Sequence, residues 1–278
     1  MKKVAIQGYP GAFHEIAARR FYADEIEVVP ADTFDDVVSF VDGQEKADSG
    51  LMAIENSISG GLLRNHYLIN HSSLQIVGEI YLRIKQNLLA LPGTKIEDLL
   101  EVHSHPMAIA QSKRYFKSHP HIKLVETRDT AESARDIQAN NWTHIGGVAS
   151  TLAAEMYGLE VLQDSIETNK KNYTRFIVLN HFMDSGDEHE FDKVSVSFAV
   201  SHENGSLYRA LKALSDQGAN MTKIQSTPIP GRPWEYLFFV DFLLDDVASF
   251  GQVFQHLGSN TRGLKVLGKY KSGNHHED

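Results

Sequence analysis

The feature that most constrains the fold is the alternation of short apolar runs with amphipathic segments through the first two thirds of the chain. Short apolar runs alternating with helical patterns are typical of βαβ units and predict an α/β region. This region is too long for one small lobe, so we expect two lobes with a ligand-binding cleft between them. The expected strands span residues 3–8, 27–31, 50–55, 74–91 and 144–149 with another near 125, and the expected helices span 14–22, 33–42, 96–100, 106–117, 130–139 and 151–157.

A different pattern follows a polar, glycine-containing stretch at residues 184–192, which we interpret as a linker. Val194, Val196 and Phe198 alternate with small residues and predict a half-buried strand. The order that follows is βαββαβ, which is the ferredoxin-like split motif. Its later elements are expected at 206–217, 220–226, 234–242, 247–257 and 263–270. We therefore predict a first domain at 1–183, a second at 193–271 and a disordered tail at 272–278.

Composition excludes several classes of function. The net charge is −9, which argues against nonspecific binding to nucleic acid. The chain has no cysteine, so disulfides, thiolate nucleophiles and Cys-ligated metals are excluded. The richest apolar stretch, residues 237–244, is interrupted by Asp241 and is too short to span a membrane. The N-terminus has no apolar signal region, and we expect a cytoplasmic protein.

Two short sequence blocks with possible binding groups follow directly after predicted strands. Gly8–Glu15 is a glycine-bearing turn before a helix, whose free N–H groups suit an anion, but such turns more often serve a steric need. Residues 54–61 cluster Glu55, Asn56 and Ser57 at a strand end. They could bind a polar ligand or cap a helix, and the residues alone favour neither.

Two further blocks carry polar groups. Residues 102–106 hold His103 and His105 two apart, as on one strand face, but a third metal ligand at suitable spacing is missing. Residues 169–176 concentrate Lys170, Lys171 and Arg175 before an apolar strand. The lysines fit a solvated loop, whereas Arg175 at the strand mouth could hold a carboxylate in a bidentate geometry.

In this order, the four blocks resemble the motifs of prephenate dehydratase, which converts prephenate to phenylpyruvate in phenylalanine biosynthesis. They are similar to Gly-Pro-x-Gly-Thr-Phe-Ser, Ile-Glu-Asn-Ser-x-x-Gly, Ser-His-Pro with a later Gln, and Asn-x-Thr-Arg-Phe. The first block departs at Tyr9, Ala12 and His14, and Ser112 replaces a usual Cys. The resemblance covers essentially the whole chain, because the βαββαβ unit looks like the ACT domain that commonly follows this enzyme and binds phenylalanine.

The resemblance implies a catalytic domain of two α/β lobes like a type II periplasmic binding protein, followed by a ferredoxin-like ACT domain. No redox cofactor or metal is expected, and prephenate should bind in the cleft. Thr174 is the candidate donor to the leaving hydroxyl, and Arg175 is expected to anchor or orient a carboxylate, directly or from behind the site. The residues carried over to the active site are Glu55, Asn56, Ser57, Ser104, Gln111, Thr174, Arg175 and Phe176.

The same resemblance implies an effector site for phenylalanine. The Gly-Ala-Leu motif of the family corresponds to Gly205-Ser206-Leu207, and its Glu-Ser-Arg-Pro motif to Gln225-Ser226-Thr227-Pro228, which has lost both charged residues. The expected contacts are Asn204, Gly205, Ser206, Leu207, Gln225 and Ser226. ACT units often pair edge to edge, so a homodimer or homotetramer is expected.

Two other functions compete with this interpretation. Arogenate dehydratase performs the same chemistry on a substrate with an amino-acid side chain. A non-catalytic amino-acid sensor could use the same cleft and ACT unit, although the Thr174-Arg175 pair argues against it. A fused chorismate mutase is not expected, because no helical extension precedes Lys3.

Overall fold

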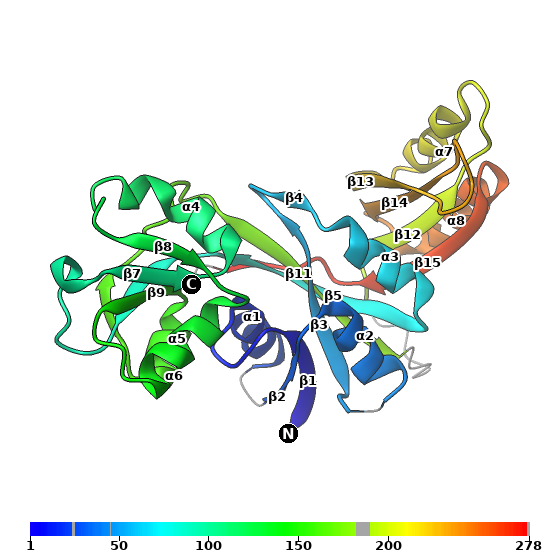
Figure 1. The fold of residues 1–278 in the computed structure, drawn as a ribbon. Helices are drawn as coiled ribbons and strands as arrows, with labels where there is room; N and C mark the ends of the chain where they lie inside the picture. The colour runs from blue at the N-terminus through cyan, green and yellow to red at the C-terminus, as the bar shows by residue number, and fades with distance from the viewer. Residues whose placement is uncertain (24–25, 45, 182–189, 277–278) are drawn as a thin grey trace.

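A computed structural model describes residues 1–23, 26–44, 46–181 and 190–276. Figure 1 shows two α/β lobes and a C-terminal unit, which we define as residues 190–276. The first lobe is built from β1 Lys2–Gln7, α1 Phe13–Tyr22, β2 Ile26–Ala31, α2 Phe34–Asp42, β3 Ser49–Asn56, β4 Gly60–Gly61, α3 Leu63–His71, β5 Leu74–Arg83 and β11 Tyr173–His181. Helix α2 begins at a capping box of Thr33 and Asp36, which satisfies backbone N–H groups at its start.

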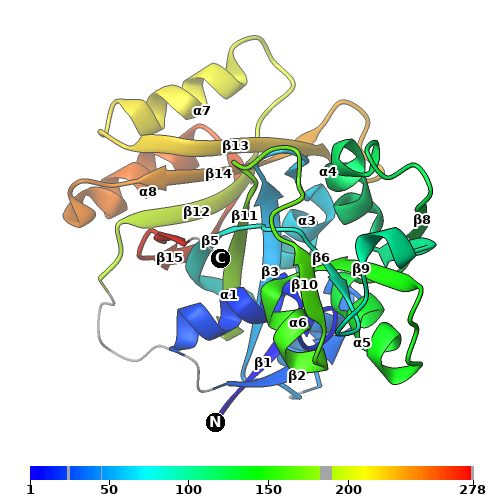
Figure 2. The same cartoon turned by 90° about the vertical axis from the view of Figure 1, so that its left-hand side faces the viewer.

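The second lobe is inserted between β5 and β11, so the chain passes between the lobes twice (Figure 2). Its sheet has the order β10-β6-β9-β7-β8. The elements are β6 Asn87–Ala90, the 3-10 helix η1 Ile96–Asp98, β7 Glu101–Ser104, α4 Pro106–Phe116, β8 Lys123–Glu126, α5 Thr130–Ala139, β9 Ile145–Ala149, α6 Thr151–Tyr157 and β10 Glu160–Gln163. The predicted two-lobed α/β arrangement is thereby confirmed.

The C-terminal unit has the predicted βαββαβ order. Its elements are β12 Lys193–Ala199, α7 Ser206–Ser215, β13 Asn220–Pro228, β14 Tyr236–Leu243, the 3-10 helix η2 Val247–Ser249, α8 Phe250–Ser259, β15 Arg262–Tyr270 and the short β16 His275–His276. The strand order β13-β14-β12-β15 is that of a ferredoxin-like sheet, with α7 and α8 packed together on one face.

One continuous sheet joins the first lobe to the C-terminal unit. Its order is β13-β14-β12-β15-β5-β11-β3-β1-β2, and the junction is a parallel pairing of Gly268 with Ile76. A Cβ on Gly268 would overlap the Ile76 carbonyl oxygen, so glycine permits this close approach. Phe239, Leu267 and Tyr270 of the C-terminal unit share an apolar core with α2, α3 and the first-lobe sheet. The first-lobe sheet is therefore packed directly against the C-terminal unit.

Several sequence predictions are corrected by the structure. The extended segment predicted over 74–91 is two strands, β5 and β6, in different sheets. The strand β12 was predicted to be half-buried, but Ser195 and Ser197 are both 1% exposed, because the serine-bearing face lies against the first lobe. Helix α3 was missed. The predicted linker lies outside the described residues up to residue 189.

The tail, which we predicted to be disordered, is placed as far as residue 276. Ser272 hydrogen-bonds through its backbone N and its Oγ to the Asp192 carboxylate, and β16 pairs in parallel with β5. The exposed edge of β5 supplies the backbone partners that make this pairing favourable. Among the described residues, none of the helices combines the length and apolar composition needed to cross a bilayer.

Candidate active site

Asn56 and Thr174 face each other across neighbouring strands. They are register partners in the antiparallel pair of β3 and β11. The Asn56 Nδ2 atom donates a hydrogen bond of 3.0 Å to Thr174 Oγ1, and Thr174 is only 9% exposed. Because Oγ1 accepts this bond, the threonine hydroxyl hydrogen is directed toward another acceptor. The pair therefore presents an oriented hydroxyl donor.

The orientation of Asn56 is fixed by the turn that follows β3. Its Oδ1 atom accepts hydrogen bonds from the backbone N–H groups of Ile58 at 3.0 Å and Ser59 at 2.9 Å. This Asx-type arrangement determines which end of the amide is the donor. Asn56 Nδ2 must consequently point toward Thr174 and its neighbours.

A chain of side-chain amides connects this pair to the second lobe. Asn56 Nδ2 also donates to Asn172 Oδ1 at 2.8 Å, and Asn172 Nδ2 donates to Gln111 Oε1 at 3.0 Å. Gln86 Nε2 donates to the same Gln111 oxygen at 3.3 Å. We call Asn56, Asn172, Gln111 and Gln86 the amide chain. Since Gln111 lies on α4 and Gln86 between β5 and β6, the amide chain ties Thr174 to both lobes.

Two predicted serines have structural partners. Ser57 Oγ donates to the Lys171 carbonyl at 3.0 Å and accepts from the Tyr173 N–H at 2.9 Å, which joins the turn after β3 to the start of β11. Ser104 is fully buried and donates to the Val148 carbonyl at 2.5 Å. Ser57 therefore lies beside the amide chain, whereas Ser104 holds two strands of the second lobe together.

Arg175 and Glu55 lie on the opposite face of the sheet from Thr174 and Asn56. Successive side chains of a strand point to opposite faces, so consecutive motif residues are separated. Arg175 Nε donates to Glu79 at 2.6 Å, its Nη1 to Asp241, and its Nη2 to the Tyr270 hydroxyl at 3.0 Å. Glu55 pairs with Lys223 of β13 at 2.7 Å. Of the two ways in which Arg175 is expected to act on a substrate carboxylate, directly or from behind the site, this arrangement favours the second, because Nε, Nη1 and Nη2 each have a partner within the protein.

Phe176 belongs to the core beneath the site. It is 1% exposed and contacts the ring of His14, with ring centroids 4.9 Å apart. His14 stands at the start of α1, and burial lowers the pKa of its imidazole to about 3. Its Nε2 is buried without a hydrogen-bond partner among the described residues. Phe176 is two residues from Thr174 on β11, so the alternation of side chains along the strand places the two on the same face of the sheet.

The glycine-bearing first turn is structural, as the residues favoured. The Gly11 N–H donates to the buried Glu15 carboxylate at 2.7 Å, so the chain's own carboxylate takes up an N–H group of this turn. The turn also contacts the second lobe, because Ser150 Oγ donates to the Gly11 carbonyl at 2.6 Å and the Tyr157 hydroxyl to the Pro10 carbonyl at 2.7 Å. It holds the two lobes together beside the site.

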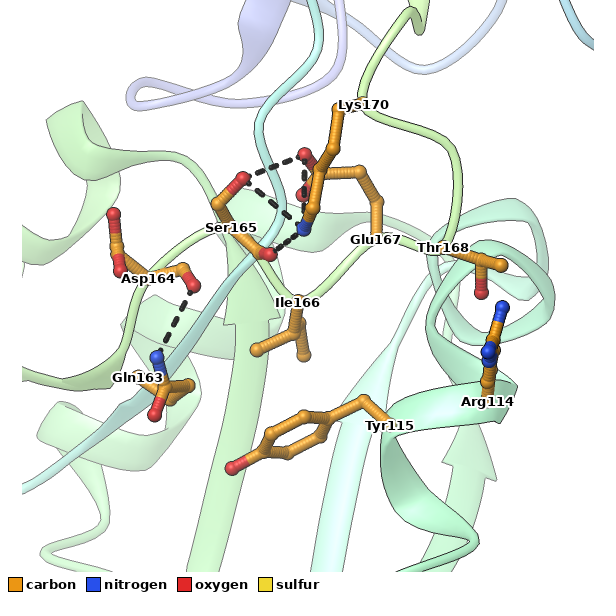
Figure 3. A pocket seen from close by; sticks show the side chains of 9 residues that line it. All are labelled: Arg114, Tyr115, Gln163, Asp164, Ser165, Ile166, Glu167, Thr168 and Lys170. Atoms are coloured by element: carbon orange, nitrogen blue, oxygen red, sulfur yellow. Dashed lines mark hydrogen bonds and ion pairs between the residues drawn. The ribbon is translucent and has the colours of Figure 1, made fainter.

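A hollow of about 350 Å³ lies between the end of α4 and the segment that follows β10 (Figure 3). Thr168, in its wall, donates through N and Oγ1 to the Gln111 carbonyl, and buried Glu167 accepts from the Gln86 N–H at 2.9 Å. None of the predicted site residues lines it. Its lining residues are Arg114, Tyr115, Gln163, Asp164, Ser165, Ile166, Glu167, Thr168 and Lys170.

The family model for prephenate dehydratase matches residues 4–183. The chain belongs to the prephenate dehydratase family. It is 35% identical over 282 residues to arogenate dehydratase/prephenate dehydratase 2 of Arabidopsis thaliana, covering 96% of this chain and 72% of that one. It is 30% identical over 276 residues to the bifunctional chorismate mutase/prephenate dehydratase of Escherichia coli strain K12, covering 98% and 71%.

Solved structures share the fold of this family member over nearly its whole length. A protein described as GqqA, a novel type of quorum quenching acylase, has a TM-score of 0.88 at 28% identity and covers 98% of each chain. The prephenate dehydratase of Arthrobacter aurescens in complex with L-Phe has a TM-score of 0.86 at 24% identity, covering 97% of this chain and 89% of that one. These similarities include the C-terminal unit as well as the lobes.

In this prephenate dehydratase family member, the predicted effector residues occupy two separate segments. Gly205 has a φ of +77° and precedes α7, where Ser206 is buried and Leu207 packs into the core of the unit. The Asn204 carbonyl accepts from Arg209. Gln225 and Ser226 lie on β13, where a Cβ on Gly61 of the first lobe would lie 3.2 Å from Gln225 Oε1. Within the described part of the chain no hydrogen bond joins the two segments.

Sequence reasoning missed two members of the amide chain. Asn172 is the first residue of the Asn-x-Thr-Arg-Phe block, so the motif itself contains a signal for this position. Asn172 is completely buried, and a buried amide must find partners for its donors and acceptor. Gln86 has no comparable signal, because it stands alone in the connection between β5 and β6.

Proposed function

We propose that the protein is a prephenate dehydratase, which converts prephenate to phenylpyruvate, water and carbon dioxide. The observation that carries the proposal is the hydroxyl of Thr174, held by Asn56 so that its hydrogen is available to an acceptor. Membership of the family and the identity to enzymes named as prephenate dehydratases support the same reaction.

The reaction needs one oriented donor. The bond between the ring carbon and its carboxylate breaks, and its electron pair moves into the ring. The bond from C4 to the hydroxyl oxygen breaks with its own electron pair, and that oxygen takes up a proton and leaves as water. Aromatisation supplies the driving force, so the site has to stabilise the departing oxygen and fix the substrate. A threonine hydroxyl is a very weak acid, and it acts here as a polarising donor or part of a proton relay.

We propose that the predicted residues play different parts in this reaction. The amide chain orients Thr174 and spans both lobes, so Asn56 and Gln111 are positioning groups for donor and substrate. Arg175 and Glu55 act from behind the site, because their charges are paired on the other face of the sheet. Phe176 serves as packing, and Ser104 stabilises the second lobe.

Arogenate dehydratase is the second candidate, because relatives whose names include arogenate dehydratase are 35% and 36% identical to this chain. The two substrates differ only in a keto or amino side chain, so rates on both decide between them. An acylase is less well supported. Its nucleophilic hydroxyl would need an adjacent base, and the partner of Thr174 Oγ1 is an amide donor that cannot accept a proton.

The purified protein is assayed for phenylpyruvate formation from prephenate and for phenylalanine formation from arogenate, each with and without EDTA. We expect turnover of prephenate that EDTA does not abolish, because the reaction requires neither a redox cofactor nor a metal. Binding of either substrate without turnover would identify a sensor instead. Faster turnover of arogenate would assign the second candidate.

We also propose that phenylalanine inhibits the enzyme by binding at the C-terminal unit. The Ser206 N–H already donates to the Glu203 carbonyl at 3.2 Å, so the carboxylate would be received by the other backbone N–H groups around Gly205 at the start of α7. A relative of the same fold is described in complex with L-Phe. Because Gln225 and Thr227 replace charged residues of the motif, inhibition should survive at reduced affinity. Binding alters catalysis only if the ligand prefers one arrangement of the unit and the lobes.

Gly205→Val is expected to raise the phenylalanine concentration for half-inhibition by at least about tenfold, because a side chain blocks close approach to the backbone and its positive φ disfavours L residues. Turnover is titrated with phenylalanine, and binding is measured by calorimetry. Gly218→Val is the matched control, since Gly218 has a φ of +74° at the other end of α7. Equal inhibition of wild type and Gly205→Val would place the effector elsewhere.

A further inference from the structure

Arg175, the residue next to Thr174, is held by residues of the C-terminal unit. Its guanidinium is 5% exposed, and three of its donors have partners. Nε bonds Glu79 of β5, but Nη1 reaches Asp241 of β14 and Nη2 reaches the hydroxyl of Tyr270 on β15. A planar guanidinium bound on several sides has little freedom to turn. Through Arg175, the segment of β11 next to Thr174 is therefore hydrogen-bonded to both the first lobe and the C-terminal unit.

These groups form a buried cluster with balanced charge. We call Glu79, Arg175, Lys193, Ser195, Asp241 and Tyr270 the interface cluster; each is less than one-tenth exposed. Lys193 Nζ contacts the Glu79 carboxylate oxygens at 2.8 and 3.0 Å. Ser195 Oγ donates to Asp241 Oδ1 at 2.6 Å and lies 2.7 Å from the Tyr270 hydroxyl. Two cations thus meet two carboxylates between the first lobe and the C-terminal unit.

The ionisation of the interface cluster agrees with this pairing. Burial alone would raise the pKa of Asp241, but the charge of Arg175 and the hydrogen bond from Ser195 outweigh it, and the pKa is lowered. Burial would likewise lower the pKa of Arg175, yet the Asp241 charge and its neighbours hold it well above the ordinary value. Both groups remain charged at neutral pH.

We propose that Asp241 is a positioning residue for the reaction at Thr174: from the C-terminal unit, it fixes Arg175 and so the place of the Thr174 hydroxyl. This inference rests on the proposed function. Without the Asp241 charge, Arg175 and Lys193 would share Glu79 alone, and a buried cation without its partner moves or recruits water. Thr174 follows any such movement, and small errors in donor position are costly in catalysis.

The first test compares Asp241→Asn with Lys265→Met in prephenate turnover. The asparagine keeps the shape and removes the charge, and we expect kcat to fall about tenfold while KM changes by less than about twofold. Lys265 is the matched control, because its Nζ also joins the C-terminal unit to the first lobe, at the carbonyls of Asn70 and Ser72, but makes no hydrogen bond to β3 or β11 among the described residues. Lys265→Met should keep the wild-type kcat.

A double variant tests whether Asp241 acts through Arg175. If it does, Asp241→Asn combined with Arg175→Gln should have the same kcat as Arg175→Gln alone, because the second change removes the group that the first would release. Multiplied losses would show that Asp241 supports the fold by an independent route. Either this result or an unchanged kcat in Asp241→Asn would overturn the inference.

Amide hydrogen exchange supplies a readout that needs no substrate. We expect faster exchange in peptides covering residues 172–176 in Asp241→Asn, but not in Lys265→Met. If the wild type turned over no prephenate, the proposed function would fall, and exchange would still decide whether Asp241 holds the Thr174 segment. Equal exchange in the two variants would overturn the positioning role even in an active enzyme.

Discussion

Thr174→Ala is expected to lower kcat by about 10²-fold or more, with a smaller change in KM. A donor to the departing hydroxyl stabilises charge that develops only in the transition state, so its loss affects the chemical step more than substrate binding. A factor of 10² corresponds to about 2.7 kcal/mol of transition-state stabilisation. Steady-state rates of phenylpyruvate formation measure both constants.

Thr174→Ser and Thr174→Val separate the hydroxyl from its surroundings. Serine keeps a hydroxyl that Asn56 can still orient, so it should retain much of the activity, whereas valine preserves the shape and removes the donor. We expect valine to resemble alanine. A valine variant with a kcat near that of the wild type would remove Thr174 from the mechanism.

The free energy of unfolding is expected to fall by about 4 kcal/mol between about pH 7 and about pH 5. Burial lowers the pKa of His14 to about 3 and that of His66 to about 4, from 6.5. The unfolded chain therefore binds a proton at each histidine as the pH drops below 6.5, while the folded protein does not. The stability that each neutral histidine contributes is fully present above its unfolded pKa. It is lost as the pH falls toward the folded pKa, at about 1.4 kcal/mol per pH unit for each histidine.

Urea unfolding at several pH values measures this slope, and variants identify its source. His66→Gln and His14→Phe should each flatten the profile by about half. His256→Gln, at an exposed position on α8, should leave it unchanged. Asp129 has the opposite effect on the free energy of unfolding as the pH falls. Burial raises the pKa of its carboxyl, so the folded protein takes up this proton at a higher pH than the unfolded chain does. A wild-type profile that is flat over this range would contradict the assignment of both histidines.

The sequence predicts the architecture well where apolar periodicity reflects burial. The alternation of strands and helices predicted both lobes and the βαββαβ unit. Helix α3 was missed because two of its core-facing residues are polar. Asn65 is 1% exposed and donates to the Ala53 carbonyl at 2.7 Å, and His66 is 5% exposed. Buried polar residues with dedicated partners leave no apolar pattern to find.

For the candidate site, the sequence indicates residues that lie close together in the structure, but it does not indicate the face of the sheet to which each side chain points. Residues 174 and 175 must face opposite sides of a strand, yet the sequence does not show which side holds the substrate. Asp241 did leave a signal, as the one charge in the apolar run 237–244, but its partner is 66 positions away in the chain. The role of such a buried charge can be inferred only when the strand that carries its partner is known.

The shared sheet limits how this architecture can be recombined during evolution. The first lobe does not present a bare edge toward the C-terminal unit, because β15 and β16 pair with β5 there. A different module fused at this boundary would have to bring an edge strand and an acidic side chain at the place of Asp241. Gene fusions lacking the acidic side chain would leave Arg175 with Glu79 of the first lobe as its carboxylate partner, so the two modules are expected to be inherited together.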